Sequence, residues 1–154
     1  MSSLKRALDF IETAEQAQSL CELQARLSKT LEHFGATQFT LMALSKRPDN
    51  GARSPQPLSE ATSREWARRY RERHYFNSDA VIHTAMRQTA PFTWADLEVR
   101  TLTPSAKTVL EEGREVLDAE GCLIIPTHDA EGFAGFVSLF FPDSSPDETQ
   151  IKAL

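Results

Sequence analysis

The chain has 154 residues, of which 40% are hydrophobic and 25% are charged. This is the size and composition of one globular domain, and it excludes a disordered, collagenous or fibrous chain. The 17 basic residues are outnumbered by 22 acidic ones, which gives a net charge of -5. Because nucleic acids are polyanions, we expect no nucleic-acid binding by this chain alone.

The two cysteines lie far apart in the sequence and form no CxxC pair. This pattern indicates neither a disulfide scaffold nor a zinc ribbon, and it fits a reducing compartment. The N-terminus has no signal-peptide pattern, and no apolar run approaches the length of a bilayer span. We therefore expect a cytoplasmic protein without membrane contact.

The first third of the chain predicts two helices and a strand. Residues 4–11 allow a short helix, and Thr13 with Gln16 has the capping-box spacing that would start a second helix. Apolar residues then recur every three or four positions up to Gly35, which is a preferred helix stop. Residues 37–44 are rich in β-formers, which predicts a strand that can be buried on both faces.

A loop and a helix are expected next. Residues 45–58 contain three prolines, an asparagine and a glycine, which predicts a surface loop with room for a short edge strand near its end. Thr62 and Glu65 form another capping box. In the helix that follows, one face is expected to carry three ring-bearing residues, Trp66, Tyr70 and His74. Another face carries three arginines that we expect to be solvated, Arg64, Arg68 and Arg71.

Two further helices have recognisable first residues. Asp79 can cap a helix that runs to about residue 87, after which residues 91–94 form a short extended piece. Thr103 and Pro104 provide the N-cap and first-turn proline of a helix that runs to about residue 119.

The C-terminal part predicts a β-hairpin and a last helix. Residues 122–127 and 133–141 are apolar, β-rich runs separated by turn-forming residues. The last helix is expected to begin at Ser145 and is cut off at Leu154 after about two turns, so we expect the natural protein to continue. The order of elements predicts an α+β fold with a largely antiparallel sheet covered by helices.

The sequence has no local signature of an enzyme. It lacks a GxSxG motif around Ser138, a phosphate-binding P-loop, a GxGxxG motif and an HExxH motif. The four histidines share no spacing typical of metal ligands. We expect no catalytic residues, no metal and no cofactor. A general base at Asp79 would have no partner motif.

Large aromatic residues are concentrated between residues 66 and 94. Both tryptophans and both tyrosines of the chain lie there, close to Asp79. Such residues can orient a mostly apolar ligand through a few directed hydrogen bonds. From residue types alone, the alternative is equally open that the aromatic residues form core and Asp79 only caps a helix.

The spacing of these residues follows a recognisable pattern. Trp66 and Tyr70 are four residues apart, Asp79 follows nine residues later, and residues 91–94 read P-F-x-W. Residues 121–126 and 132–139 add a strand ending in proline and a glycine-containing hairpin strand with Ser138. Together, these segments resemble the autoinducer-binding domain of LuxR-type quorum-sensing regulators over nearly the whole chain.

The resemblance implies an α-β-α sandwich, with helices on both faces of the sheet, that encloses an acyl-homoserine lactone. By position, Trp66 would donate to the lactone carbonyl, Asp79 would accept from the ligand amide N–H, and Ser138 would reach the amide carbonyl. Since Trp only donates and an ionised Asp only accepts, the head group can pair with them in one orientation. Tyr70 and Trp94 would pack around the ligand. Residues expected to line the acyl pocket are Thr40, Met42, Leu44, Leu110 and Ile124.

Three positions depart from the family pattern. The family often has a tyrosine where this chain has Thr62, a proline where it has Ala80, and a glycine where it has Cys122, with Gly121 one position early. At Cys122, either the register slips or a side chain enters the pocket region.

The resemblance also implies an architecture and partners. Residues 1–154 would form one ligand-sensing domain that homodimerises, and DNA would be bound only through a C-terminal helix-turn-helix domain that this chain lacks. The alternative is an orphan regulator domain, which keeps the fold for dimerisation but binds no acyl-homoserine lactone.

Overall fold

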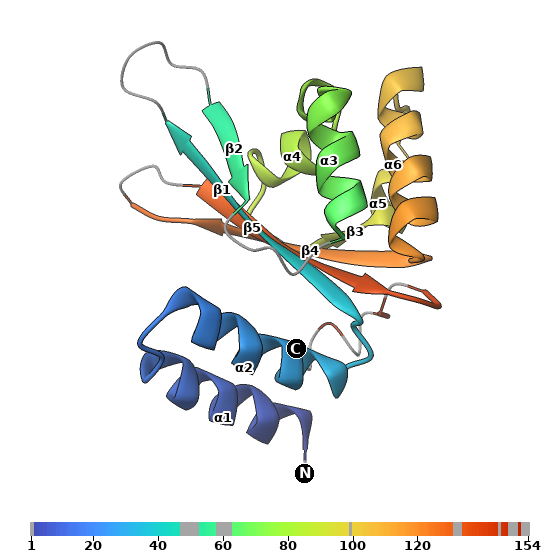
Figure 1. Ribbon diagram of the computed structural model, residues 1–154. Coiled ribbons are helices and arrows are strands. Elements are labelled where there is room, and N and C mark those ends of the chain that lie inside the picture. The colour runs from blue at the N-terminus through green and yellow to red at the C-terminus, as the bar shows by residue number, and fades with distance from the viewer. Residues whose placement is uncertain are drawn as a thin grey trace.

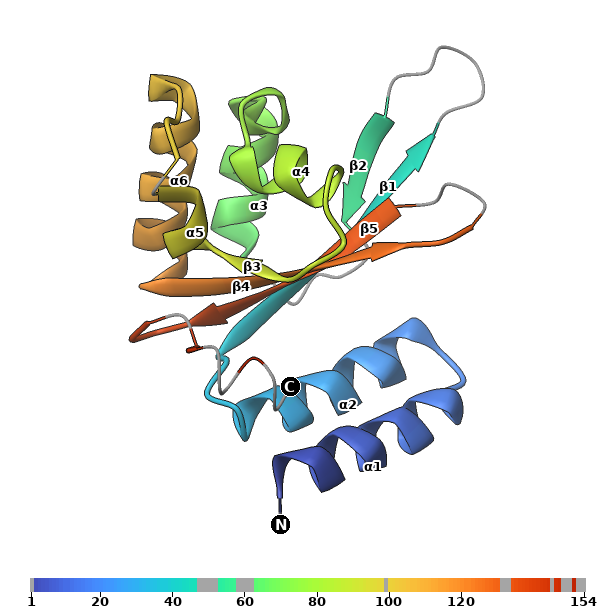
Figure 2. The same ribbon diagram turned by 180° about the vertical axis from the view of Figure 1, so that it is seen from behind.

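The structure is a computed structural model that describes residues 2–46, 53–57, 63–98, 100–130, 134–144, 146–147 and 151. Its helices and strands form three layers, with one sheet between two groups of helices (Figures 1 and 2). Helices α1 (Ser3–Glu15) and α2 (Leu20–Glu32) cover one face, and helices α3 to α6 cover the other. This arrangement confirms the predicted fold.

The sheet has five strands in the order β2-β1-β5-β4-β3, and every neighbouring pair is antiparallel. The strands are β1 (Gln38–Lys46), β2 (Arg53–Pro57), β3 (Phe92–Thr93), β4 (Gly121–His128) and β5 (Ala134–Phe141). Strands β4 and β5 form the predicted hairpin. Strand β2 is the edge strand expected within the loop, and it includes Pro55 and Pro57.

The boundary between α1 and α2 differs from the prediction. Thr13 lies inside α1, where its hydroxyl donates to the Asp9 carbonyl at 2.9 Å, so the Thr13–Gln16 capping box does not start a helix. The N-cap of α2 is Ser19, which accepts from the Glu22 backbone N–H at 3.1 Å. An isolated capping-box spacing therefore gave the wrong start, because a Thr hydroxyl can also bond to the preceding turn of its own helix.

The other helix group begins with α3 (Arg64–Glu72), whose N-cap is Ser63 rather than Thr62. Thr62 itself lies outside the described residues. Because α3 ends at Glu72, His74 does not share the helical face of Trp66 and Tyr70, and its backbone is left-handed with φ of 52°.

The remaining helices are a 3-10 turn, η1 (Tyr75–Asn77), and the α-helices α4 (Ala80–Ala85), α5 (Trp94–Glu98) and α6 (Pro104–Leu117). Asp79 caps α4 and Thr103 caps α6, as predicted. Helix α5 was not predicted. Of the predicted C-terminal helix, the described part shows a helical Ile151 whose N–H donates to the Asp147 carbonyl at 2.8 Å, and the rest lies outside the described residues.

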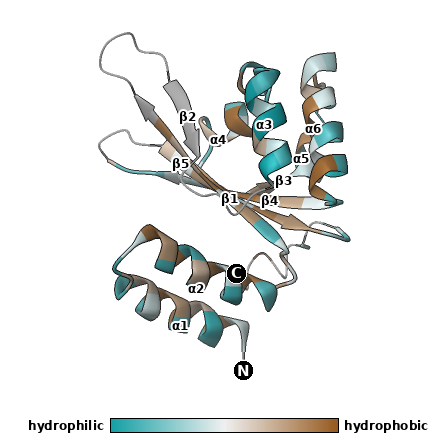
Figure 3. Ribbon diagram, in the orientation of Figure 1, coloured by the Kyte–Doolittle hydropathy of each residue, from teal (hydrophilic) through white to brown (hydrophobic). Residues whose placement is uncertain are grey.

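The two faces of the sheet contribute to two separate cores. On the α1–α2 side, Phe39, Leu123 and Leu139 are buried with Leu31 of α2. On the α3–α6 side, strand residues including Ile124, Phe136 and Phe140 pack with residues of α4, α5 and α6. Figure 3 shows the hydrophobic strands between the helix layers and a largely hydrophilic α3. In the described part of the chain, no helix is long and apolar enough to cross a membrane.

Candidate functional site

A cavity of about 1070 Å³ lies on the α3–α6 side of the sheet. Its walls come from β1, β4 and β5, from α3 and α6, and from the segment around η1 and α4. Binding sites for small molecules typically measure about 300–1,000 Å³. The cavity is therefore large enough for a ligand with a polar head and an extended chain.

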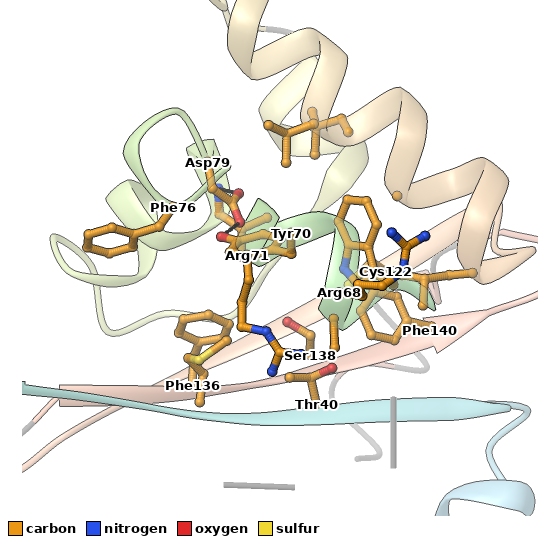
Figure 4. Close-up of a pocket in the computed structure, with 18 of the residues that line it drawn as sticks. Thr40, Arg68, Tyr70, Arg71, Phe76, Asp79, Cys122, Phe136, Ser138 and Phe140 are labelled. Carbon is orange, nitrogen blue, oxygen red and sulfur yellow. Dashed lines mark hydrogen bonds between the residues drawn. The ribbon is translucent and has the colours of Figure 1, made fainter. Parts of the chain in front are cut away.

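The polar anchor of the cavity is Asp79, which is 7% exposed. One carboxylate oxygen accepts the Tyr70 hydroxyl at 2.5 Å, and the other accepts the Val81 backbone N–H at 2.8 Å. Figure 4 shows Tyr70 and Asp79 directed toward each other across the upper part of the cavity. The capping of α4 thus fixes the position of an acceptor inside the site.

Burial dominates the electrostatics of this pair. It raises the pKa of Asp79, although the hydrogen bonds from Tyr70 and Val81 act in the opposite direction. Burial and the neighbouring Asp79 also raise the pKa of Tyr70, so its hydroxyl keeps its proton and remains a donor.

Two indole rings flank α6 where that helix has a glycine. A Cβ placed on Gly113 would lie 3.4 Å from the Trp66 ring and 3.8 Å from the Trp94 ring. Trp66 also packs edge-on against Tyr70, with 5.6 Å between ring centroids, and Trp94 lies 5.8 Å from the Phe140 ring. The small residue in α6 lets both tryptophans reach the cavity wall.

The floor of the cavity is one face of the sheet. Thr40 of β1 and Ser138 of β5 are direct partners in the strand register, and Cys122 of β4 is the partner of Phe140. All four side chains line the cavity. The Cys122 side chain therefore enters the pocket wall, and burial raises the pKa of its thiol.

Most residues predicted for the site surround this one cavity. The lining includes Trp66, Tyr70, Asp79, Trp94, Ser138, Thr40, Met42 and Leu110. Ile124 and Leu44 are on the same side of the sheet but lie in the core beside the cavity, each with 0% exposure, and not in its wall.

Sequence reasoning did not identify Phe136 and Phe140 as lining residues. Their signal was present, because alternate residues of a strand face the same side and both phenylalanines alternate with Ser138.

Three arginines of α3 also line the cavity. The sequence predicted that they form a solvated face and did not predict that this face borders a cavity. Arg64, Arg68 and Arg71 are exposed, yet all three contribute to the wall. Arg68 forms an ion pair with Glu72 at 2.7 Å. Figure 4 shows the Arg71 side chain extending from α3 toward the sheet strands that carry Ser138 and Thr40.

Helices α3 and α6 are held together beside the cavity by Glu112. Its carboxylate forms an ion pair with Arg73 at 2.6 Å, lies 3.5 Å from Arg69, and accepts the Tyr75 hydroxyl. The hydrogen bond from Tyr75 and the positive charges of Arg73 and Arg69 lower the pKa of Glu112. This cluster connects α3, η1 and α6, whose residues form much of the cavity wall.

The motif spacing and the site geometry agree with a comparison of sequences. Residues 19–154 match the family described as "Autoinducer binding domain", so the chain belongs to that family. The predicted family is confirmed, and it is a family of signal-binding regulatory domains rather than a class of enzymes. No curated protein is similar enough in sequence to count as a match.

Solved structures show the same fold at low sequence identity. CepR2 from Burkholderia cenocepacia, an N-acylhomoserine lactone dependent LuxR family transcription factor, is similar with a TM-score of 0.79 and 15% identity, covering 97% of this chain and 85% of that chain. SdiA from Escherichia coli is similar with a TM-score of 0.75 and 12% identity, covering 96% of this chain and 61% of the SdiA chain. The present chain therefore spans less than two thirds of that SdiA chain.

Two more solved structures are similar. The VqsR ligand-binding domain from Pseudomonas aeruginosa has a TM-score of 0.64 and 16% identity, covering 94% of this chain and 84% of that chain. SdiA in complex with octanoyl-rac-glycerol has a TM-score of 0.75 and 11% identity, covering 95% of this chain and 58% of the SdiA chain.

Proposed function

We propose that this chain is the ligand-sensing domain of a LuxR-type regulator and binds an acyl-homoserine lactone or a related small signal in the cavity described above. The observation that carries the proposal is the convergence of Trp66, Tyr70, Asp79, Trp94 and Ser138 on one cavity of about 1070 Å³. These residues come from four separate segments of the chain: α3, the N-cap of α4, α5 and β5.

The roles proposed for the polar residues follow from their hydrogen-bonding capacity. The Trp66 indole N–H can only donate, which suits a lactone carbonyl. The ionised Asp79 can only accept, which suits an amide N–H. The Ser138 hydroxyl can donate to the amide carbonyl. Tyr70 has a different role, because its hydroxyl already donates to Asp79; it positions the acceptor and contributes its ring to the wall.

The acyl part of the signal would lie against the apolar walls. Met42 and Phe136 line the cavity from the sheet, and Val109, Leu110 and Leu117 line it from α6. SdiA has been solved with octanoyl-rac-glycerol, a ligand with a polar head and an eight-carbon chain. A related ligand with this general shape suits the cavity of the present chain.

The partners proposed for the whole regulator are a second copy of this domain and DNA. CepR2 is a transcription factor, and by analogy a dimer of sensing domains would space two DNA-binding domains on a palindromic site. This chain carries the sensing step.

The proposed function is tested by titrating the protein with acyl-homoserine lactones of increasing chain length. Both tryptophans of the chain line the cavity, so their fluorescence reports binding directly. At a ligand concentration of about 100 times Kd, binding should stabilise the fold by about 2.7 kcal/mol and raise the melting temperature by roughly 5–10 °C.

Two controls separate specific from non-specific effects. Homoserine lactone without an acyl chain should bind weakly, since it leaves the apolar wall uncovered. Trp66→Phe keeps an aromatic ring but removes the donor, and should weaken binding by about tenfold. If no lactone of any length changes the fluorescence or the melting temperature, the proposal is wrong and the orphan alternative takes its place.

A further inference from the structure

The inference concerns the surface through which two copies of this domain meet, and it rests on the dimer included in the proposed function. Four large apolar side chains of the described residues are exposed, and three of them lie on α1. Leu4 is 68% exposed, Leu8 51% and Ile11 53%. At spacings of four and three residues they form one continuous stripe along the helix, the α1 stripe. Apolar residues scattered singly over a surface need no explanation, but a contiguous stripe does.

Helix α1 is the outermost element on its side of the sheet (Figures 1 and 2). It packs against α2, and none of its residues, all of which the structure describes, is buried. Its partly buried apolar residues, Ala7, Phe10 and Ala14, lie on a different face of the helix from the α1 stripe. The packing of α1 onto α2 therefore leaves the stripe uncovered in the described part of the chain.

The charges of α1 are segregated along its length. The first turn contains Lys5 and no acidic residue, and the last turn contains Glu12 and Glu15 and no basic residue. This order opposes the dipole of α1 itself, because a helix favours acidic side chains at its N-terminus and basic ones at its C-terminus. In an antiparallel pair of such helices, each charged end lies beside the oppositely charged end of the other helix. The charges that are unfavourable in one α1 are therefore complementary between two.

We propose that α1 pairs with α1 of a second copy, antiparallel and about a two-fold axis near Leu8. Such an axis makes the α1 stripe self-complementary, since Leu8 meets the partner's Leu8 and Leu4 meets the partner's Ile11. On the side of the stripe that is turned away from α2, Lys5 lies opposite the partner's Glu12, twice in each dimer. The apolar residues supply the affinity, and the two charge pairs at the rim fix the antiparallel orientation.

The composition of α1 favours a second copy over a lipid surface. Helices that lie in a membrane interface are rich in lysine and arginine on the polar face, because these residues are attracted to anionic lipids. Three of the five charged residues of α1 are acidic: Asp9, Glu12 and Glu15, beside Lys5 and Arg6.

The first test is sedimentation equilibrium of the 154-residue chain over a range of protein concentrations. The wild-type chain should pass from monomer to dimer as the concentration rises. Leu8→Glu should raise the dissociation constant of the dimer at least about tenfold, because it places two carboxylates at the axis. Because Leu8 is 51% exposed, the variant should keep the melting temperature of the dissociated wild-type chain, which establishes that it is folded.

Charge reversal at low salt tests the orientation. Lys5→Glu and Glu12→Lys should each raise the dissociation constant at least about fivefold, because each places like charges opposite one another at two positions. An equimolar mixture of the two variants should form a mixed dimer about as stable as the wild-type dimer, since every pair is then of opposite sign. Lys107→Glu is the matched control, because Lys107 is an exposed lysine of α6 on the other side of the sheet, and it should leave the dissociation constant within about twofold of wild type.

The outcomes distinguish this inference from the proposed function. A dimer that Leu8→Glu and the charge reversals leave unchanged overturns the inference, because the copies then meet elsewhere, and it leaves the proposed dimer intact. A chain that stays monomeric at every concentration overturns both the inference and the proposed dimer. A monomeric chain that floats with phosphatidylglycerol vesicles does the same and assigns the stripe to a membrane surface. Lactone binding is measured separately by tryptophan fluorescence, which the α1 variants should leave unchanged.

Discussion

The two oxygens of the Asp79 carboxylate have different partners. One accepts the Val81 backbone N–H at the start of α4, and the other accepts the Tyr70 hydroxyl. A carboxylate has about four acceptor positions, so roughly two remain for a ligand. The two interpretations left open by the sequence are therefore compatible: Asp79 does cap a helix, and the same group still has the capacity to bind an amide N–H.

Replacing Asp79 by Asn should separate these two roles. The amide oxygen of Asn can still accept from Val81, while its NH₂ group replaces the oxygen that accepts from Tyr70. The Tyr70 hydroxyl can rotate and accept from this NH₂ group, but the NH₂ group cannot accept the ligand N–H. We expect Asp79→Asn to weaken lactone binding by at least about tenfold with little loss of stability, whereas Asp79→Ala should also cost about 1–3 kcal/mol of unfolding free energy. Calorimetric binding and urea unfolding measure the two effects.

The pH dependence provides an internal control for this prediction. Burial raises the pKa of Asp79, and a protonated carboxyl accepts less well than a carboxylate. Wild-type affinity should therefore rise with pH through a midpoint above the ordinary value of 3.8, and the affinity of Asp79→Asn should lack this rise. Equal affinities of wild type and Asp79→Asn at neutral pH would contradict the assignment of Asp79 as the acceptor.

The contact between helix α6 and the two tryptophans depends on Gly113. A Cβ at this position would be in ordinary van der Waals contact with Trp66, at 3.4 Å. A methyl group therefore fits, but a longer side chain would have to displace one of the indole rings. The space around residue 113 therefore limits the size of the side chain that α6 can carry at this position.

Two substitutions at Gly113 should have opposite effects. Gly113→Ala should raise stability by up to about 1 kcal/mol, because glycine is a poor residue within a helix, and it should preserve binding. Gly113→Leu should lower stability by about 1–3 kcal/mol through overpacking and should weaken binding by displacing Trp66 or Trp94. Thermal unfolding and tryptophan fluorescence check both results. Unchanged fluorescence and affinity in Gly113→Leu would show that the rings are not held by this contact.

At the scale of elements, the sequence predicted what local chemistry determines. The structure confirms the caps Asp79 and Thr103 and the β4–β5 hairpin. These features could be predicted because each has a turn or capping signal within a few residues. It did not predict that α2 begins after Ser19 rather than near Thr13, since both residues can bond to nearby backbone groups. Tertiary packing decides between such starts.

The part of the candidate site that could be predicted is the set of residues that belong to the family's sequence pattern. Trp66, Asp79 and Ser138 were identified by spacing, and the structure brings them to one cavity. Arg71 was assigned to solvent because α3 carries many charges and its pattern does not reveal which stripe adjoins a cavity. That information depends on the angle at which α3 packs over the sheet.

In the whole molecule, the sheet separates the side that carries the cavity from the side that packs against α1 and α2. Consecutive residues of β5 demonstrate this division: Phe136 lines the cavity, and Val137 packs into the core shared with α2. Since neighbouring residues of a strand point in opposite directions, stability and binding can be changed independently at adjacent positions.

We therefore expect Val137→Ala to affect mainly the stability of the protein and Phe136→Leu to affect mainly ligand binding. Val137→Ala should lower the unfolding free energy by about 1–2 kcal/mol and leave the ligand Kd within about twofold of wild type. Phe136→Leu should change the Kd and its dependence on acyl chain length, because it reshapes the cavity wall. Urea unfolding and fluorescence titration separate the effects. A large change in Kd for Val137→Ala would mean that the two sides are coupled.

The edge strands of the sheet affect how the protein can associate with other chains. An open sheet edge can recruit a further strand through its unpaired N–H and C=O groups. Strand β2 at one edge contains Pro55 and Pro57, which have no N–H to offer, and β3 at the other edge is two residues long. Both edges of the sheet are thereby protected against pairing with a strand of another chain and against growth into continuous β-structure.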